Sequence, residues 1–167
     1  MATLRRSLVV SVLFTFCGGP ALVLVLMPWY ITHFRIPAGE SHASIVAAIA
    51  LIAAGLTPLF ESIGRFVVAG RGTLVPAVPT EHLVVSGLYR FVRNPMYIGV
   101  IIALSGQALL FRSGHMLFYL GIVWLIMHAF VCLYEEPMLA RTFEEEYQRF
   151  RNHVPRWIPR LKPWTDG

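Results

Sequence analysis

The sequence predicts an all-α integral membrane protein with about four transmembrane helices and a cytoplasmic amphipathic helix near the C-terminus. Of the 167 residues, 56% are hydrophobic and 14% are charged, and the mean hydropathy is +0.64. That is more apolar surface than one small soluble core can bury. A helix needs about 20 mostly apolar residues to cross the hydrocarbon layer. Four segments come near that length: Leu8–Tyr30, Ser44–Ala69, Pro95–Phe111 and His115–Tyr134.

The first of these segments follows Arg5 and Arg6, as the apolar core of a signal peptide would. Its apolar run continues through Trp29, which is longer than the usual signal core, so we expect the segment to be retained. A Gly-Gly-Pro sequence at 18–20 interrupts the run. Because proline removes a helix hydrogen bond, a kink is predicted there.

The distribution of cationic residues predicts the orientation. With four spans, the N-terminus, the connection between the second and third spans, and the C-terminus share one side, which holds most of the 14 lysines and arginines. The positive-inside rule makes that side cytoplasmic. We therefore expect a bacterial inner-membrane protein surrounded by membrane lipids. Its pI of 9.7 then follows from topology and anionic headgroups, and no nucleic-acid partner is expected.

The cysteines and histidines predict no disulfide and no metal site. Cys17 and Cys132 both fall inside predicted spans, where cysteine acts as a small apolar residue. The six histidines, among them His82 and His128, show no metal-ligand spacing. We interpret them as packed or isolated polar residues.

The second span ends near Glu61 and Arg65, which are four residues apart and should form an ion pair on a continuing helix. Glycine and proline then punctuate residues 70–79 too densely for a helix. This connection is long enough to be a binding loop. We therefore divide one structural domain into an N-terminal transmembrane helical pair, 1–69, and a cofactor-binding and catalytic region, 70–167.

The stretch Ser86–Gly99 places cationic and polar residues directly before a long apolar run. Asn94 is expected to cap the third span, and Pro95 suits the first helical position because no hydrogen bond is lost there. Arg90 and Arg93 lie just upstream. The positive end of the helix and both guanidinium groups would then meet water at the membrane surface, which predicts a site for an anionic group.

The third and fourth spans are joined only by residues 112–114, so they must be antiparallel neighbours. The fourth span returns to the cytoplasmic side at Glu135 and Glu136, and the hairpin should bring these carboxylates close to Arg90–Pro95. Pro137 is expected to end the span and to begin a new helix, with the two carboxylates at the junction.

From Pro137 to Asn152 the pattern is that of an amphipathic helix, with apolar residues at spacings of three and four. This helix is too polar to span a membrane. Two roles are open for it, a lid over the site or an anchor on the membrane surface. The tail that follows is rich in proline, and its Trp157 and Trp164 suit the membrane interface.

Together these features resemble the isoprenylcysteine carboxyl methyltransferase family and the related phospholipid methyltransferases, over residues 70–161. Ser-Gly-Leu-Tyr-Arg-Phe-Val-Arg-Asn-Pro-Met-Tyr-Ile-Gly is similar to the family's Gly-x-Tyr-x-x-x-Arg-His-Pro-x-Tyr-x-Gly. Glu135-Glu136-x-x-Leu139 is similar to its paired-glutamate motif, and a Phe-Glu-Glu-Glu-Tyr run and a proline-rich tail follow in the same order. Asn94 departs from the pattern, because eukaryotic members have histidine there.

The resemblance implies a membrane methyltransferase that uses S-adenosylmethionine and releases S-adenosylhomocysteine. Its acceptor would be lipophilic, and the reaction most like isoprenylcysteine carboxyl O-methylation. On the matching positions, the resemblance implies a cofactor site formed by Tyr89, Arg93, Asn94, Pro95, Tyr97, Gly99, Glu135 and Glu136. The expected catalytic residues are Arg90, Arg93 and Glu136.

Methyl transfer from a sulfonium is an in-line displacement that needs alignment more than a nucleophilic side chain. For a carboxylate acceptor, Arg90 or Arg93 would orient the anion by bidentate hydrogen bonds. An amine acceptor, as in phosphatidylethanolamine, must lose a proton, and Glu135 or Glu136 would serve as the base. Both reactions stay open, as do an NADPH-dependent sterol-type reductase and a non-catalytic lipid-binding or transport protein.

Overall fold

A computed structural model describes residues 19–68, 83 and 85–165 of the chain. Within these ranges the chain folds into helices and no strand, which confirms the predicted all-helical class for them. Residues 8–18 of the first predicted span, the connection at 70–79, Cys17 and His82 lie outside the described residues.

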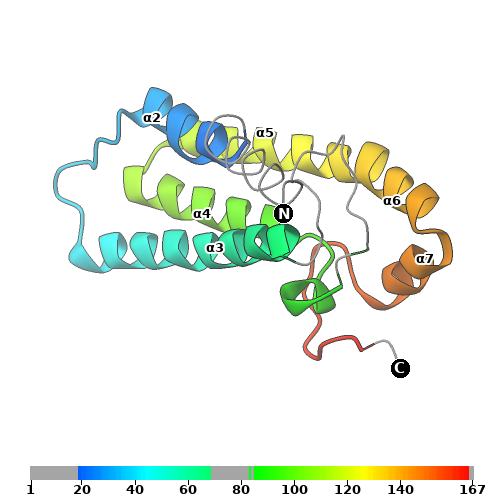
Figure 1. The fold of residues 1–167 in the computed structure, drawn as a ribbon. Coiled ribbons are helices and arrows are strands. Elements are labelled where there is room, and N and C mark those ends of the chain that lie inside the picture. The colour runs from blue at the N-terminus through cyan, green and yellow to red at the C-terminus, as the bar shows by residue number, and fades with distance from the viewer. Residues whose placement is uncertain (1–18, 69–82, 84, 166–167) are drawn as a thin grey trace.

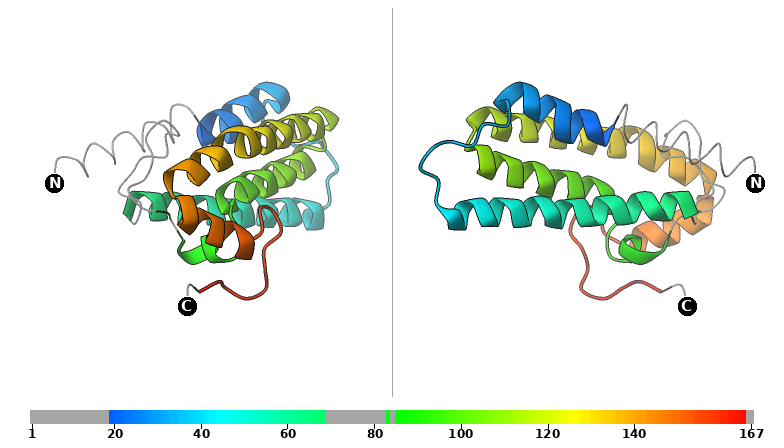
Figure 2. Two further views of the ribbon diagram at one scale, coloured as in Figure 1. Left: turned by 90° about the vertical axis from the view of Figure 1, so that its right-hand side faces the viewer. Right: turned by 60° about the vertical axis from the view of Figure 1, so that its left-hand side comes forward.

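Three long helices form the body of the molecule: α3 (His42–Val68), α4 (Pro95–Phe111) and α5 (Gly114–Phe130). Figures 1 and 2 show α4 between α3 and α5, with α2 (Met27–Thr32) running along α5. A π-helical turn, η1 (Leu22–Leu26), leads into α2. Because α4 has a helix on each side, it contributes more buried residues to the core than either neighbour.

The contact between α3 and α4 is built from small residues. Gly55 of α3 and Gly99 of α4 face one another so closely that a Cβ on either would overlap the backbone of the other helix. Gly106 approaches α3 in the same way, since its Cβ would lie 2.8 Å from the Ala48 carbonyl oxygen. Small residues let helix backbones approach in a membrane, where van der Waals packing drives association. The position of α4 therefore depends on these glycines.

Two described helices are long and apolar enough to cross a membrane, His42–Arg65 and the continuous helix Gly114–Thr142. The bounds of α4 match the predicted third span, but its 17 residues rise only about 26 Å at 1.5 Å per residue. The apolar helix Leu22–Thr32 is shorter still. The length criterion is therefore met by two of the four predicted spans.

The hairpin between α4 and α5 forms as predicted. Arg112 ends α4 in a left-handed conformation (φ 43°), and the Ser113 hydroxyl caps α5 by accepting from the Met116 N–H at 3.4 Å. The Arg112 guanidinium also pairs with Glu40, in the loop before α3, at 2.9 Å. The short turn returns the chain to the end of the molecule where α4 begins.

The prediction that Pro137 ends the fourth span is wrong. A π-helical turn, η3 (Val131–Glu135), follows α5, and α6 (Glu136–Thr142) continues the same helix with Pro137 in its first turn. Proline has no N–H and crowds the carbonyl four residues before it. The helix opens there to an i→i+5 hydrogen bond from the Glu136 N–H to the Val131 carbonyl. The two carboxylates therefore lie on a continuous helix.

The predicted helix 137–152 is divided in two. It breaks after α6, and Glu144, in a left-handed conformation (φ 40°), begins α7 (Glu144–His153). The break lets α7 turn its Tyr147 and Phe150 into a second apolar cluster, in which both are buried. A single helix would have carried these rings along the axis of α6 instead.

The tail after α7 runs beside η2 (Gly87–Arg90) and the segment before α4 (Figure 1). Trp164 of the tail packs on the cluster of Tyr147 and Phe150. Three backbone hydrogen bonds of 2.9 to 3.0 Å join the tail to this segment: Arg93 N–H to Pro155 O, Arg160 N–H to Phe91 O and Trp164 N–H to Arg90 O. The tail is therefore an integral part of the site region.

His128 of α5 is a packed histidine. Its ring stacks on Trp124 with centroids 5.2 Å apart, and its Nδ1 accepts from the Trp157 Nε1–H at 3.1 Å. Cys132 lies one turn further along, with its Sγ 3.7 Å from the His128 Nε2. In the part of the chain that the structure describes, no three side chains of the metal-binding kinds cluster. These contacts fix the tail to α5.

We predict that Gly55→Ala destabilises the protein by about 2 kcal/mol, because the new methyl group overlaps the α4 backbone and overpacking costs about 1–3 kcal/mol. Gly64→Ala is the matched control in the same helix, since no described atom beyond its own stretch of helix lies within 4 Å of its Cβ position. Thermal unfolding in detergent measures both. Equal melting temperatures for the two variants would contradict the close approach of α3 and α4.

Candidate functional site

Glu136 is the centre of a buried ion network in which three segments of the chain meet. Its Oε1 accepts from Arg93 Nη1 at 2.8 Å and from Arg156 Nε at 2.6 Å. Its Oε2 accepts from Arg156 Nη2 at 2.9 Å. The Glu136 side chain is only 9% exposed. Charged, bidentate hydrogen bonds are strong and directional, so the three side chains fix one another in place.

Tyr147 adds α7 to this network, because its hydroxyl oxygen accepts from Arg93 Nη1 at 3.2 Å. Burial raises the pKa of Tyr147, and the nearby Glu136 carboxylate raises it further. The hydrogen bond to Glu136 raises the pKa of the Arg156 guanidinium. At neutral pH the phenol therefore stays neutral and the guanidinium stays charged.

The adjacent carboxylate, Glu135, has different surroundings. The Tyr97 hydroxyl donates to Glu135 Oε2 at 3.0 Å. The Tyr89 phenol lies beside Ser62 of α3 and near Glu135, and burial raises its pKa, which keeps it neutral. Among the described residues, no cation pairs with Glu135. Glu136 is thus paired with two cations of the protein, whereas the described cations leave Glu135 unpaired.

Arg93 also keeps one donor for a ligand. Its Nε is buried and has no hydrogen-bond acceptor among the described residues. An unsatisfied buried donor costs about 1–3 kcal/mol, so a bound acceptor would stabilise this arrangement. The site therefore combines a donor of Arg93 that has no described acceptor with a carboxyl group, Glu135, that has no described cation.

The prediction that the Asn94 side chain caps α4 is wrong. Asn94 occupies the N-cap position, and its carbonyl accepts from the Ile98 N–H at 3.2 Å. Its side-chain Nδ2 instead donates to the Arg156 carbonyl at 3.1 Å. That carbonyl needs a donor because the tail lies against this segment. Asn94 therefore holds in place the backbone of the residue that neutralises Glu136.

The structure brings together five of the eight predicted cofactor-site residues: Tyr89, Arg93, Tyr97, Glu135 and Glu136. Pro95 is buried at the first position of α4, as predicted for that residue. Gly99 faces α3 and packs against Gly55 and the Leu59 N–H. Helix packing accounts for this glycine, and its contact with a cofactor stays a prediction.

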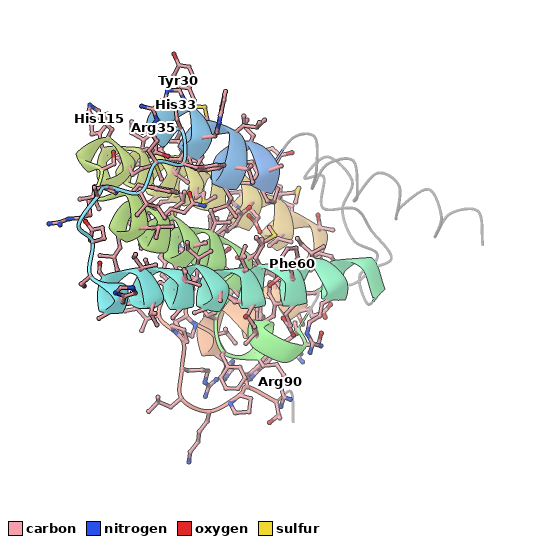
Figure 3. All side chains as sticks on the ribbon, turned by 90° about the vertical axis from the view of Figure 1, so that its left-hand side faces the viewer. Tyr30, His33, Arg35, Phe60, Arg90 and His115 are labelled. Atoms are coloured by element: carbon pink, nitrogen blue, oxygen red, sulfur yellow. The ribbon has the colours of Figure 1, made fainter. Side chains whose placement is uncertain are left out.

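Arg90 lies apart from the Glu136 network. Its Nε donates to the Trp164 carbonyl at 2.7 Å, and its side chain lines a cavity of about 600 Å³. Figure 3 shows Arg90 on the opposite side of the helical layer from Tyr30. Arg65, Ser86, Glu146 and Thr165 also line this cavity with polar side chains. Arg90 and Arg93 are three residues apart and serve different parts of the site.

The predicted ion pair between Glu61 and Arg65 is confirmed. Gly87 packs on this pair so closely that a Cβ would overlap both the Arg65 guanidinium and the Glu61 carboxylate. Its φ of 56° is a left-handed conformation that also favours glycine. This glycine fixes η2 against the end of α3, which positions Tyr89 and Arg90.

Sequence patterns do not single out Arg156 or Tyr147. Arg156 stands near two prolines in a tail that suits the membrane interface, and Tyr147 fits the apolar face of an amphipathic helix. The feature of the sequence that could point to Arg156 is the pair of adjacent carboxylates, because a buried carboxylate requires cations nearby. Which cation supplies the charge depends on the path of the tail.

Comparison with known proteins gives two matches. The family model described as phospholipid methyltransferase matches residues 43–146, which include α3 to α6 and both carboxylates. The protein-S-isoprenylcysteine O-methyltransferase of Schizosaccharomyces pombe is 35% identical over 81 residues, covering 47% of this chain and 34% of that protein. The chain therefore matches about a third of the length of this curated relative. No solved structure matches the chain.

We predict that Glu136→Gln destabilises the protein by about 3 kcal/mol, because it leaves the buried Arg93 and the partly exposed Arg156 without a counter-charge. Glu135→Gln is the matched neighbour and should cost less than about 1 kcal/mol, since its amide oxygen still accepts from Tyr97. Chemical unfolding in detergent measures both values. A larger loss for the Glu135 variant would show that the roles of the two carboxylates are reversed.

Proposed function

The chain belongs to the phospholipid methyltransferase family, and from this membership we propose that it transfers a methyl group from S-adenosylmethionine to a lipophilic acceptor, leaving S-adenosylhomocysteine. The observation that carries this proposal is the difference between two adjacent carboxylates. Glu136 is neutralised by two arginines, whereas Glu135 has a phenolic donor and no described cation. A cationic cofactor is favoured beside a carboxylate that the protein leaves unneutralised.

The side chains present suit S-adenosylmethionine. Its sulfonium and ammonium groups are cationic and match the Glu135 carboxylate. Its carboxylate matches the unused Nε–H of Arg93. The rings of Tyr89 and Tyr97 add aromatic surface, which attracts a cation at its face. We assign these four residues to the cofactor, with Glu136 holding Arg93 in position.

S-adenosylmethionine supplies a methyl group bound to a sulfonium, and the chain supplies alignment and electrostatics. Glu135 and Arg93 would hold the cofactor, and the rigid network behind Arg93 keeps that donor in place. α7 and the tail screen the network from water, because Tyr147 and Val154 are buried there. This contact favours the lid role for α7 over the role of a surface anchor.

We place the helices across the membrane four times, with the site at the cytoplasmic face. Two long apolar helices and the bounds of α4 support this arrangement. The tail beside the site carries Arg156, Arg160 and Lys162, and cationic residues favour the cytoplasmic side. The region 70–167 then supplies most of the site, and 1–69 supports it with Ser62 and the Glu61–Arg65 pair.

We assign the acceptor's headgroup to the cavity beside Arg90. Arg65 and Arg90 both line it, and the buried Ser86 hydroxyl there has no described partner. Guanidinium groups bind carboxylates with matched geometry. A carboxylate acceptor would give O-methylation, the activity in the name of the Schizosaccharomyces pombe relative.

A second candidate function is N-methylation of an aminophospholipid, and Glu146 favours it. Glu146 lines the same cavity as the two arginines, so the cavity presents both signs of charge. A phosphoethanolamine headgroup carries an anionic phosphate and a cationic amine, which match this arrangement. Glu146, which lines the cavity, would then accept the proton that the amine must lose.

We predict that Arg90→Ala lowers the rate of labelled-methyl transfer about tenfold, equivalent to about 1.4 kcal/mol, while the affinity for S-adenosylmethionine changes less than about twofold. The reason is that Arg90 lies in the cavity and apart from the Glu136 network. Arg149→Ala is the matched control, because it removes an exposed arginine of α7. Equal loss of transfer and of cofactor affinity would contradict this division.

The same assay distinguishes the two acceptors. Vesicles containing phosphatidylethanolamine and a farnesylcysteine analogue are offered in parallel, with wild type and Glu146→Gln. N-methylation predicts transfer to the phospholipid that falls in the Glu146 variant. O-methylation predicts transfer to the farnesylcysteine carboxylate that this variant leaves intact. Transfer to neither class would contradict the proposed function.

A further inference from the structure

The π-helical turn η3 determines which residues of the α5 helix face the site. Before the turn, the inner face of the helix follows α-helical spacing through Met116, Leu120, Val123, Met127 and Val131. At 3.6 residues per turn, the next position in this series is about 134. In the structure Glu135 takes that place and contacts α4 through Tyr97, while Tyr134 is 46% exposed.

One extra residue explains this change. An i→i+5 turn contains one residue more than an α-helical turn, so everything after it rotates by about 100°. In a regular helix Tyr134 would face the bundle, Glu135 would lie about 100° around the axis, and Glu136 would lie about 200° around it. The extra residue turns Glu135 toward Tyr97 and Glu136 toward Arg93. Both carboxylates therefore owe their positions to η3.

Proline permits this turn but does not dictate it. Both π-helical turns in the described ranges are followed by a proline two residues later, η1 by Pro28 and η3 by Pro137. Pro58, in contrast, lies inside α3, which is α-helical along its whole length. At η3, the ion pairs of Glu136 add the stabilisation that favours the widened turn.

We propose that η3 is a positioning element of the methyl-transfer site and that Pro137 is its positioning residue. Pro137 has no N–H to donate to the Leu133 carbonyl, so the regular helix loses its competing hydrogen bond. The consequence for methyl transfer rests on the proposed function, whereas the orientation that η3 gives to Glu135 and Glu136 does not. A regular α-helix one residue shorter would present both carboxylates on the same faces.

Deletion of Leu133 in a Pro137→Ala background tests this equivalence. Leu133 is 79% exposed, so its removal takes away little internal packing. The deletion should convert η3 to an α-helical turn and leave Glu135 and Glu136 facing the site. Insertion of one alanine after Leu133, which is exposed, is the matched control in the same background, because a helix one residue longer turns Glu135 and Glu136 about 100° further around the axis. That insertion should rotate both carboxylates away.

Two readouts separate geometry from function. The first is the fall in melting temperature caused by Arg156→Ala, which reports the Glu136–Arg156 contact without any ligand. The second is the affinity for S-adenosylmethionine. The Leu133 deletion should keep the full Arg156→Ala effect and an affinity within about threefold of wild type. The alanine insertion should lose both, or fail to fold.

A Leu133 deletion that does not fold or loses the Arg156→Ala effect would overturn the proposal. Retention of that effect in the alanine insertion would overturn it as well. If wild type does not bind S-adenosylmethionine while the melting temperatures follow the expected pattern, the positioning role stands and the proposed function is wrong.

Discussion

The ion pairs of Glu136 with Arg93 and Arg156 hold together the end of the molecule where α4 begins. A carboxylate buried between helices is unstable by several kcal/mol unless cations accompany it. Arg93 brings the segment before α4, and Arg156 brings the tail. The tail in turn bonds the backbone of this segment and the side chain of Asn94. One buried charge thereby fixes segments more than 60 residues apart.

The two adjacent carboxylates have different roles because their neighbours differ. The charge of Glu136 is used inside the protein to build a rigid frame, whereas Glu135 lies beside two phenols and no described cation. Arg156 and Tyr147, which complete the frame, lie beyond the residues 43–146 that match the family model. The part of the chain that matches the family is therefore completed by α7 and the tail.

Local and short-range features could be predicted from the sequence. The bounds of α4, the tight hairpin and the Glu61–Arg65 pair all follow from apolar length, connection length and i,i+4 spacing. The partner of Asn94 and the role of Arg156 could not, because both depend on the path of a tail folded back over more than 60 residues. The turn η3 was also beyond prediction, because proline alone permits several outcomes and tertiary ion pairs select one.

Calorimetric titration of the detergent-purified protein with S-adenosylmethionine, and separately with NADPH, tests the central claim most directly. The arrangement of Glu135, Arg93 and the two phenols predicts binding of S-adenosylmethionine and none of NADPH. Glu135→Gln should weaken that binding about tenfold, because the cofactor loses its counter-charge. Binding of NADPH alone would indicate a reductase. Binding of neither compound would contradict the assignment of Glu135 and Arg93 to a cofactor.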